Sequence, residues 1–314
     1  MTSQTQIVIS NPVNNKDQFH HAVNGISLCY RTYGDSTATP LLLIAGLGLQ
    51  LTYWPEAFIQ GFVAQGYFVI AFDNRDIGRS SRINAKPPTL FRQLLRLRSH
   101  LDYDLYDMAE DSIGLIDHLG IKKFHIIGMS MGGMIAQTIS AFHSSRVLSL
   151  TSIFSSTGAR HVGQPAPLTL LMLAKKPAKT REQAIQLYLK MAKYISSPIY
   201  FFDRNKAQLY AGEAWDRGNG INAHYGVKRQ IAAIIKSGDR TEQLRLITVP
   251  TLILHGEKDV LVHPSGGKAT FEAIYQARHI TVHGLGHYFS EGVIPQLLGL
   301  IIENMQRSLT NHHL

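Results

Sequence analysis

The chain has 314 residues and a mass of 35.0 kDa, enough to bury most of its apolar surface in one large domain without disulfides or metals. With 45% hydrophobic and 17% charged residues, its composition is that of a packed globule and excludes a disordered or fibrous chain. Its formal net charge of +9 attracts anionic substrates, acidic proteins, anionic lipid or nucleic acid without choosing among them.

Cysteine use and the lack of long apolar runs predict a cytoplasmic protein. Cys29 is the single cysteine, so neither an internal disulfide nor a cysteine-based zinc cluster can form. The segment before Lys16 lacks the basic residues and the apolar run of a secretory signal. Runs such as Leu41–Ala45 fall far short of the roughly 20 residues that cross a bilayer. We therefore expect no membrane span.

Seven short runs rich in β-forming residues predict strands. Most are continuous rather than alternating, which is typical of strands buried on both faces. The runs are Ile26–Tyr33, Leu41–Ala45, Tyr67–Phe72, Phe124–Ile127, Val147–Phe154, Thr251–Leu254 and His279–Val282. Helical patterns lie between some of them, at Pro55–Ala64 and Leu105–Leu119. This order predicts an α/β fold with a mostly parallel central sheet covered by helices on both faces.

Strand signals vanish between about Thr157 and Ser237. Helix-like stretches replace them at Thr180–Tyr194, Asn205–Trp215 and Val227–Lys236. The strand pattern then resumes, which indicates one sheet domain interrupted once. We predict a helical cap over residues 157–237, inserted into a core made of residues 1–156 and 238–314.

The segment around Ser130 carries the most informative motif. It reads Gly128-Met129-Ser130-Met131-Gly132, a G-x-S-x-G pattern between a predicted strand and an apolar helix pattern. A serine at a strand-to-helix elbow sits on a strained turn, and glycines two residues before and after it leave room for the neighbouring strand and helix. We predict that Ser130 is a nucleophile; the alternative is a tight turn with an incidental serine.

A serine hydroxyl needs a histidine to take its proton, and that histidine needs a carboxylate to hold it. Asp259 follows the buried run that ends at Leu254, and sites in open α/β sheets form at the carboxyl ends of strands. Glu257 competes for the role but lies nearer the strand. His287 stands in a glycine-rich loop after the last predicted strand. We predict the triad Ser130, Asp259 and His287.

The histidines His279, His283 and His287 are spaced by four, which on a helix would resemble metal ligands. Ile280, Thr281 and Val282 favour a strand instead, and glycines follow. We therefore expect no metal site here.

The same route needs backbone donors for the oxyanion that forms when a serine attacks a carbonyl. One is expected to be the amide of Met131, directly after the nucleophile. The second is expected from the loop after the run Leu41–Ala45, where we choose Leu47. If Gly46 and Gly48 only make a turn there, the donor shifts by one residue.

Seven motifs along the chain support the predicted hydrolytic site. They span residues 72–80, 106–111, 128–133, 229–230, 237–241, 249–252 and 284–287. With them the chain resembles the α/β-hydrolase superfamily from about Gly25 to Gly299, and within it the cap-bearing esterase branch that includes aclacinomycin methylesterase. The resemblance implies a carboxylesterase that acts on a small-molecule ester, expected to be a methyl ester, without a cofactor. The chain departs from many relatives at Ala45-Gly46, where they have His-Gly, and at the added segment 88–100.

Two alternatives stay open. The same triad can serve carbon–carbon bond hydrolysis or perhydrolysis in this superfamily, or the fold can serve as a non-enzymatic binding protein, against which a complete triad argues. Nucleic-acid binding is not expected, because the basic residues form no recognised nucleic-acid module.

Charged segments suggest partners and structural pairs. The resemblance makes residues 72–80 a structural loop, in which Asp73 and Arg75 are expected to pair with the backbone or with each other. Arg92, Arg96 and Arg98 alternate with leucines in a segment that either covers the pocket as a flap or docks on an anionic surface. Six basic residues of the cap predict a rim that could recruit an acidic carrier or an anionic substrate: Lys175, Lys176, Lys179, Arg181, Lys190 and Lys193.

Overall fold

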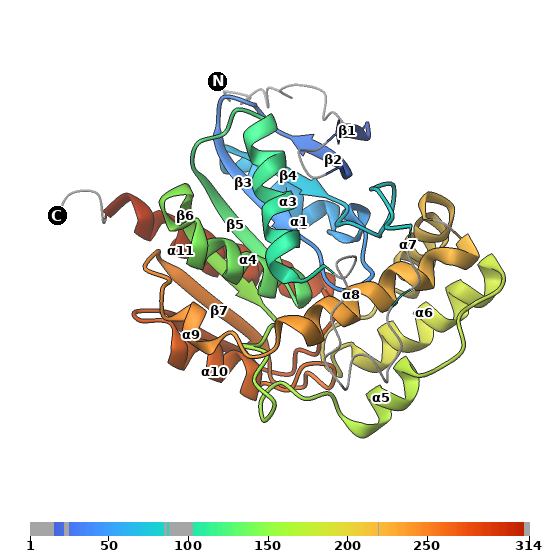
Figure 1. Cartoon of the computed structure of the whole chain (residues 1–314). Helices are drawn as coiled ribbons and strands as arrows, with labels where there is room; N and C mark the ends of the chain where they lie inside the picture. The colour runs from blue at the N-terminus through green and yellow to red at the C-terminus, as the bar shows by residue number, and fades with distance from the viewer. Residues whose placement is uncertain (1–15, 22–24, 85–86, 88–102, 219, 311–314) are drawn as a thin grey trace, which may run out of the picture.

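A central sheet of eight strands organises the part of the chain that the computed structural model describes, residues 16–21, 25–84, 87, 103–218 and 220–310 (Figure 1). Its strand order is β1-β2-β4-β3-β5-β6-β7-β8. The strands are β1 (Gln18–His21), β2 (Ser27–Tyr33), β3 (Thr39–Ile44), β4 (Tyr67–Phe72), β5 (Phe124–Met129), β6 (Val147–Ile153), β7 (Thr251–Gly256) and β8 (Arg278–Val282). β1 and β2 run antiparallel at one edge, and every pair from β4 to β8 is parallel. The sheet is therefore mostly parallel, as predicted.

Helices cover both faces of the sheet (Figure 1). Their bounds are α1 (Glu56–Ala64), α3 (Leu105–His118), α4 (Met131–Phe142), α9 (Thr241–Leu244), α10 (Ser265–Ala273) and α11 (Ile294–Thr310). The side chains of β3 show how the two faces are filled: Leu42 and Ile44 join the cluster packed against α3 and α4, whereas Leu41 and Leu43 join the one packed against α1 and α11. Because alternate residues face opposite layers and both layers are apolar, a continuous apolar run results.

The helix α11 shows the complementary pattern for a helix with one buried face. Leu297, Ile301 and Met305 recur every four residues and are buried against the sheet, while Glu303 is exposed. At 17 residues this helix closes the second layer of the fold. Among the described residues, no helix has both the length and the apolar content that a bilayer crossing requires.

Four further helices lie between β6 and β7 and stand together beside the sheet (Figure 1). They are α5 (Pro167–Leu173), α6 (Arg181–Ile195), α7 (Arg204–Arg217) and α8 (Ala223–Ser237). Three of them begin within one or a few residues of the helical stretches expected from the sequence. The limits of the cap at residues 157 and 237 stay a prediction.

All seven predicted strands are present, within a few residues of their expected ends. The sequence did not indicate β1, a four-residue strand that contains two histidines and a glutamine. It also did not indicate α5, whose seven residues leave Leu170 and Leu171 exposed. Both elements are short and lack the periodic burial on which sequence-based prediction depends.

The loop after β4 contains two buried charges that pair differently from the expectation. Asp73 accepts hydrogen bonds from the amides of Leu51 (2.7 Å) and Arg79 (3.0 Å) and forms an ion pair with Arg217 of α7. Arg75 donates two hydrogen bonds to Asp111 of α3, at 2.6 and 2.7 Å. The expected backbone contacts of Asp73 are present, but the two residues do not pair with each other, because each has a partner on a different helix.

The Arg75–Asp111 pair predicts a strong stability effect. Burial raises the pKa of Asp111, and the guanidinium of Arg75 opposes that shift. Replacing Asp111 by Asn leaves the Arg75 guanidinium buried without a countercharge, so the free energy of unfolding should fall by roughly 3–5 kcal/mol. Urea unfolding at pH 7 measures this loss. The matched control is Asp216→Asn, which removes an exposed pair with Arg181 and should leave the urea midpoint unchanged. Equal losses in both variants would contradict the prediction.

Candidate active site

Ser130 occupies the sharp turn at which β5 ends and α4 begins. Its φ of 56° lies in the left-handed region, which costs a residue other than glycine about 1–3 kcal/mol and persists only where the surroundings impose it. The Ser130 amide donates to the Ile153 carbonyl of β6 at 2.8 Å, and its own carbonyl accepts from the Met134 amide. This is the strand–turn–helix setting that a nucleophilic serine requires.

The glycines Gly128 and Gly132 lie where no side chain fits. A Cβ on Gly128 would lie 2.1 Å from the Gly132 carbonyl oxygen, and one on Gly132 would lie 2.1 Å from the Ile44 carbonyl oxygen. Gly133 is also crowded, since its Cβ would come within 2.7 Å of the Ser155 side chain. The backbones of β3, β5 and α4 therefore approach one another directly beside Ser130.

Asp259 and His287 form a buried pair. Asp259 lies in the turn after β7 and His287 in the loop after β8, and the His287 Nδ1 lies 2.6 Å from the Asp259 Oδ2. The other carboxylate oxygen accepts from the amides of Leu261 (2.9 Å) and Val262 (2.8 Å). Burial alone raises the pKa of Asp259, but the charge of His287 and hydrogen bonds from histidine hold that pKa well below its ordinary range. The carboxylate is therefore ionised and oriented toward His287.

Glu257, the competing acid, points elsewhere. It accepts from the Gly284 amide at 2.9 Å and lies 2.8 Å from the exposed ring of His283. Its other oxygen lies 3.2 Å from the Lys258 ammonium. These contacts place Glu257 at the surface of the turn, and the geometry favours Asp259 as the partner of His287.

Ser130 and His287 lie on either side of the end of β6. The Ser130 amide is bound to Ile153, and the next residue, Phe154, has its ring 5.3 Å from the ring of His287. The hydrogen bonds of the described residues join His287 to Asp259 and do not join it to Ser130. Such nucleophile–base contacts often tighten only when substrate is bound.

The loop after β3 lies against the serine, since a Cβ on Gly46 would be 3.2 Å from the Ser130 Cβ. Most of its amides are occupied: Leu49 donates to the Gly46 carbonyl, and Leu51 donates to Asp73. Gly48 and Gln50 donate to side chains of the helical segment. Within the described residues, no hydrogen bond occupies the Leu47 amide. Met131 is the first residue of α4, where the geometry of a helix leaves the amide without an internal acceptor.

Three helices of the segment 157–237 hold the loops of this site. Gln230 of α8 is fully buried; its Oε1 accepts from the Gly48 amide at 3.0 Å and its Nε2 donates to the Arg75 carbonyl at 2.9 Å. The Tyr210 hydroxyl of α7 accepts from the Gln50 amide. The Ile195 carbonyl, at the end of α6, accepts from the His287 amide at 2.7 Å.

No role for these contacts was predicted from the sequence. Arg229 and Gln230 belong to one of the family motifs, and they are two polar residues on the same buried face of α8 as Ala232 and Ala233. That position is the feature that could have identified them. Arg229 donates to both carboxylate oxygens of Asp76, at 2.8 and 2.6 Å. A buried polar pair on an apolar helix face indicates a fixed partner, although the sequence does not say which.

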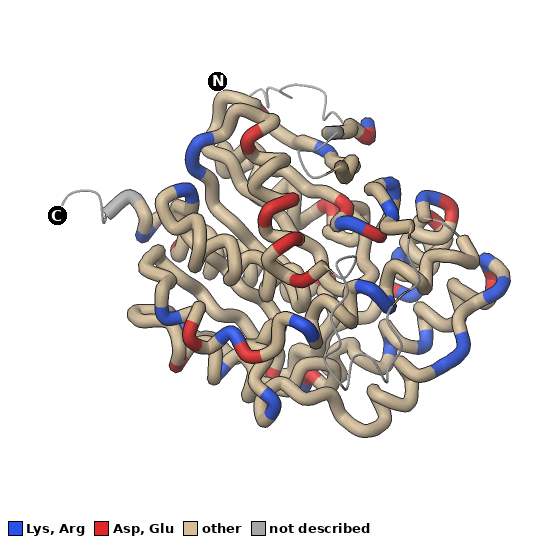
Figure 2. Tube along the Cα trace, in the orientation of Figure 1, with Lys and Arg blue, Asp and Glu red and all other residues tan. Residues whose placement is uncertain are grey.

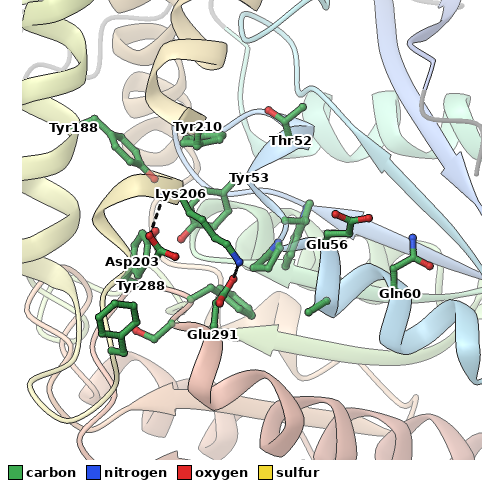
Figure 3. Close-up of a pocket in the computed structure, with 16 residues that line it drawn as sticks. Thr52, Tyr53, Glu56, Gln60, Tyr188, Asp203, Lys206, Tyr210, Tyr288 and Glu291 are labelled. Carbon is green, nitrogen blue, oxygen red and sulfur yellow. Dashed lines mark hydrogen bonds and ion pairs between the residues drawn. The ribbon is translucent and has the colours of Figure 1, made fainter. Parts of the chain in front are cut away.

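A cavity of about 580 Å³ opens beside the predicted base (Figure 3). Figure 3 shows Lys206 extended toward Glu291, with Asp203 and Tyr288 on one side and Glu56 on the other. The tyrosines of its wall are Tyr53, Tyr188, Tyr210 and Tyr288. Tyr288 directly follows His287, and burial together with the charges of Asp203 and Glu291 raises the pKa of its hydroxyl to about 12. The lining therefore combines aromatic rings with three carboxylates and one ammonium.

The structure describes only one of the two basic segments that the sequence singled out. Arg92, Arg96 and Arg98 lie outside the described residues. The basic residues of the predicted rim are exposed, on α6 and on the loop before it (Figure 2).

The histidines spaced by four do not share a helix face. Residues 278–282 form β8, and among the described residues no group of three His, Cys, Asp or Glu side chains lies close enough to hold a metal ion. His279 is partly buried, its ring stacked on Phe271, and His283 is exposed.

Known proteins share this architecture. The chain is 27% identical to rhodomycin D methylesterase DauP of Streptomyces sp. strain C5 over 288 residues, 83% of this chain and 89% of the relative. It is 26% identical to a non-heme haloperoxidase of Rhodococcus erythropolis, over 86% of this chain and 92% of that protein. The enol-lactonase of Burkholderia xenovorans LB400 has the same fold, with a TM-score of 0.69 at 18% identity, covering 92% of this chain and all of that one. A family model for the alpha/beta hydrolase fold matches residues 39–291. The chain belongs to the α/β-hydrolase fold family.

Proposed function

We propose that this protein is a serine carboxylesterase that cleaves small-molecule esters through an acyl-enzyme intermediate. The observation that carries the proposal is the combination of Ser130 at a strained elbow with the buried Asp259–His287 pair, on either side of the end of β6. Both features cost free energy of folding: a positive φ strains serine, and a buried carboxylate must be compensated by partners. Their presence together is more readily explained by catalysis than by folding.

The chemistry follows from these positions. His287 takes the proton of the Ser130 hydroxyl as its oxygen attacks the ester carbonyl, and the amides of Met131 and Leu47 stabilise the oxyanion that forms. The carbon–oxygen bond to the alcohol breaks, and His287 returns the proton to the alcohol. Water then attacks the acyl-serine with His287 again as base, releasing the acid and restoring Ser130. The reaction requires no cofactor or metal.

The substrate class is supported by relatives at 27% identity, which are named methylesterases. We therefore propose a methyl ester of a small molecule as the substrate.

We propose that the helical segment 157–237 is a cap over the site. The proposal is supported by the contacts of Ile195, Tyr210 and Gln230 with the loops of the site. We also propose a cytoplasmic location, because the single cysteine, Cys29, is a buried free thiol and the fold uses no disulfide among the described residues.

The first prediction tests the nucleophile. Ser130→Ala should lower kcat for an activated ester by roughly 10⁴-fold or more, because no acyl-enzyme can form, while circular dichroism stays that of the parent. A phosphonate ester should label the parent and not the variant, as measured by intact-protein mass spectrometry. Ser145→Ala, at an exposed serine, is the control and should behave as the parent. A Ser130→Ala protein with parental turnover would falsify the proposed function.

The second prediction separates the two candidate acids. Asp259→Asn should lower kcat by roughly 10⁴-fold, because an asparagine amide holds His287 in the wrong tautomer. Glu257→Gln should change kcat less than twofold, since its contacts are with Gly284, Lys258 and His283. Steady-state kinetics with one ester decide the matter, and comparable losses in both variants would mean that the acid is wrongly assigned.

A third prediction concerns recruitment. We propose that the basic rim draws in anionic esters or an acidic carrier by long-range attraction. For an anionic ester, kcat/KM should fall several-fold as salt rises from about 0.05 to 0.5 M, a range that cuts the Debye length to about a third. Replacing Lys175, Lys176 and Lys179 together by Gln should reduce this salt dependence. A neutral ester of the same size is the control. If both esters respond alike, the rim is only a solvated surface.

A further inference from the structure

A second histidine contacts the carboxylate of Asp259. His255 lies in β7, and its side chain is fully buried. Its Nε2 lies 2.8 Å from the Val262 carbonyl oxygen and 3.3 Å from the Asp259 Oδ2, the oxygen that also faces His287. The carboxylate is therefore flanked by two imidazoles that come from two different segments of the chain.

The partners of His255 determine where its proton lies. A carbonyl oxygen and a carboxylate oxygen can only accept, so the Nε2 must carry the hydrogen. The Nδ1 has no hydrogen-bond partner within the described residues. It faces α10, where a Cβ on Gly267 would come within 2.6 Å of it. A second proton on the Nδ1 would be a buried donor that meets no acceptor.

Two titratable groups lie near the ring of His255: Asp259 from the following turn and His279 from β8. The uncharged ring of Phe154, after β6, packs edge to face with it. No acidic residue other than Asp259 is recorded against the ring in the described chain.

The contact with Val262 makes the arrangement rigid. Val262 donates its amide to the Asp259 Oδ1 and accepts, through its carbonyl, from His255. The imidazole thus bonds to the turn that holds the carboxylate, and its Nε2 lies 3.3 Å from the carboxylate itself. Four nitrogens surround Asp259: two amides donate to the Oδ1, and the imidazoles of His287 and His255 lie 2.6 and 3.3 Å from the Oδ2.

We propose that His255 is a positioning residue for Asp259, which keeps the carboxylate ionised and turned toward His287 during ester hydrolysis. The proposal rests on the proposed function, because it assigns a role in the same triad. Without the Nε2 donor, less of the carboxylate charge is shared, so Asp259 attracts the proton on His287 more strongly. His287 then keeps its proton to higher pH, and the base form needed for attack on the ester is lost over the lower part of the pH range.

The test compares His255→Met with His255→Gln in the full chain. A glutamine amide can replace the Nε2 donor, whereas methionine fills the space without a donor. Active sites are titrated with a phosphonate ester, and kcat/KM is measured against pH per titrated site. In His255→Met we expect kcat to fall about 10–100-fold, KM to change less than about threefold, and the acid limb of the profile to move to higher pH. His255→Gln should restore most of the rate and the parental acid limb.

A purely structural role gives a different result. If titrated sites of His255→Met turn over at the parental rate with the parental pH profile, while only the melting temperature falls, His255 merely packs β7 against α10 and the proposal is wrong. The same holds if His255→Gln is as impaired as His255→Met.

A measurement on the unaltered protein keeps the test decisive if the methionine variant fails to fold. Nitrogen-15 NMR of the histidine-labelled protein reports which ring nitrogen of His255 bears hydrogen. A proton on the Nε2 supports the proposal, and a proton on the Nδ1 overturns it, because the Nε2 could then not donate to Asp259. The failure of the proposed function looks different: the parent would lack Ser130-dependent ester hydrolysis, whatever the tautomer of His255.

Discussion

The contact of backbone with backbone between β5, α4 and β3 is the constraint on which the site depends. Gly128 and Gly132 let these elements lie so close together that no Cβ would fit between them. The chain passes from strand to helix within this narrow space at Ser130, which therefore takes a positive φ. The same closeness brings the loop after β3 against the serine at Gly46. The close packing of these backbones therefore leaves Ser130 only partly buried at the turn and sets the amide of Met131 at the start of a helix. It also places the loop after β3 beside both residues.

The two loops that serve the serine are not held by the sheet alone. The loop after β3 is fastened through Gly48 to Gln230 of α8 and through Gln50 to Tyr210 of α7, and the amide of His287 is fastened to the end of α6. Movements of these helices would therefore reach both the proposed oxyanion donors and the proposed base. The ion pairs of Arg217 with Asp73 and of Arg229 with Asp76 resist such movements, because separating them would leave buried charges.

The sequence predicted what is encoded locally. The strand, the elbow and the start of the helix around Ser130 lie within about a dozen residues, and each has its own pattern. Asp259 and His287 could be placed because each follows a recognisable strand, and parallel strands bring their carboxyl ends to one edge. Long-range polar contacts could not be placed in this way: Gln230 meets Gly48 across 182 residues, and nothing in either segment identifies the other.

The ion pairs that were not predicted have one origin. Asp73 and Arg75 were expected to pair with the backbone or with each other. The backbone contacts are present, but the loop also directs the two side chains toward α7 and α3, where Arg217 and Asp111 lie. His255 stands only four residues before Asp259, yet its role depends on the turn at Val262 that folds the carboxylate back over the ring. Sequence spacing gives proximity along the chain, whereas side-chain direction is set by tertiary packing.

The charge of the molecule acts differently at long and at short range. A net charge of +9 and an exposed basic rim attract anions from solution, but the cavity beside Tyr288 holds Glu56, Asp203 and Glu291 against Lys206 alone. All three carboxylates raise the pKa of Lys206, and the largest cause is the hydrogen bond that Lys206 donates to Glu291, so the local field favours cations. An anionic group drawn toward the protein would therefore be disfavoured in this cavity, whose carboxylates and tyrosine rings suit a neutral or cationic group instead.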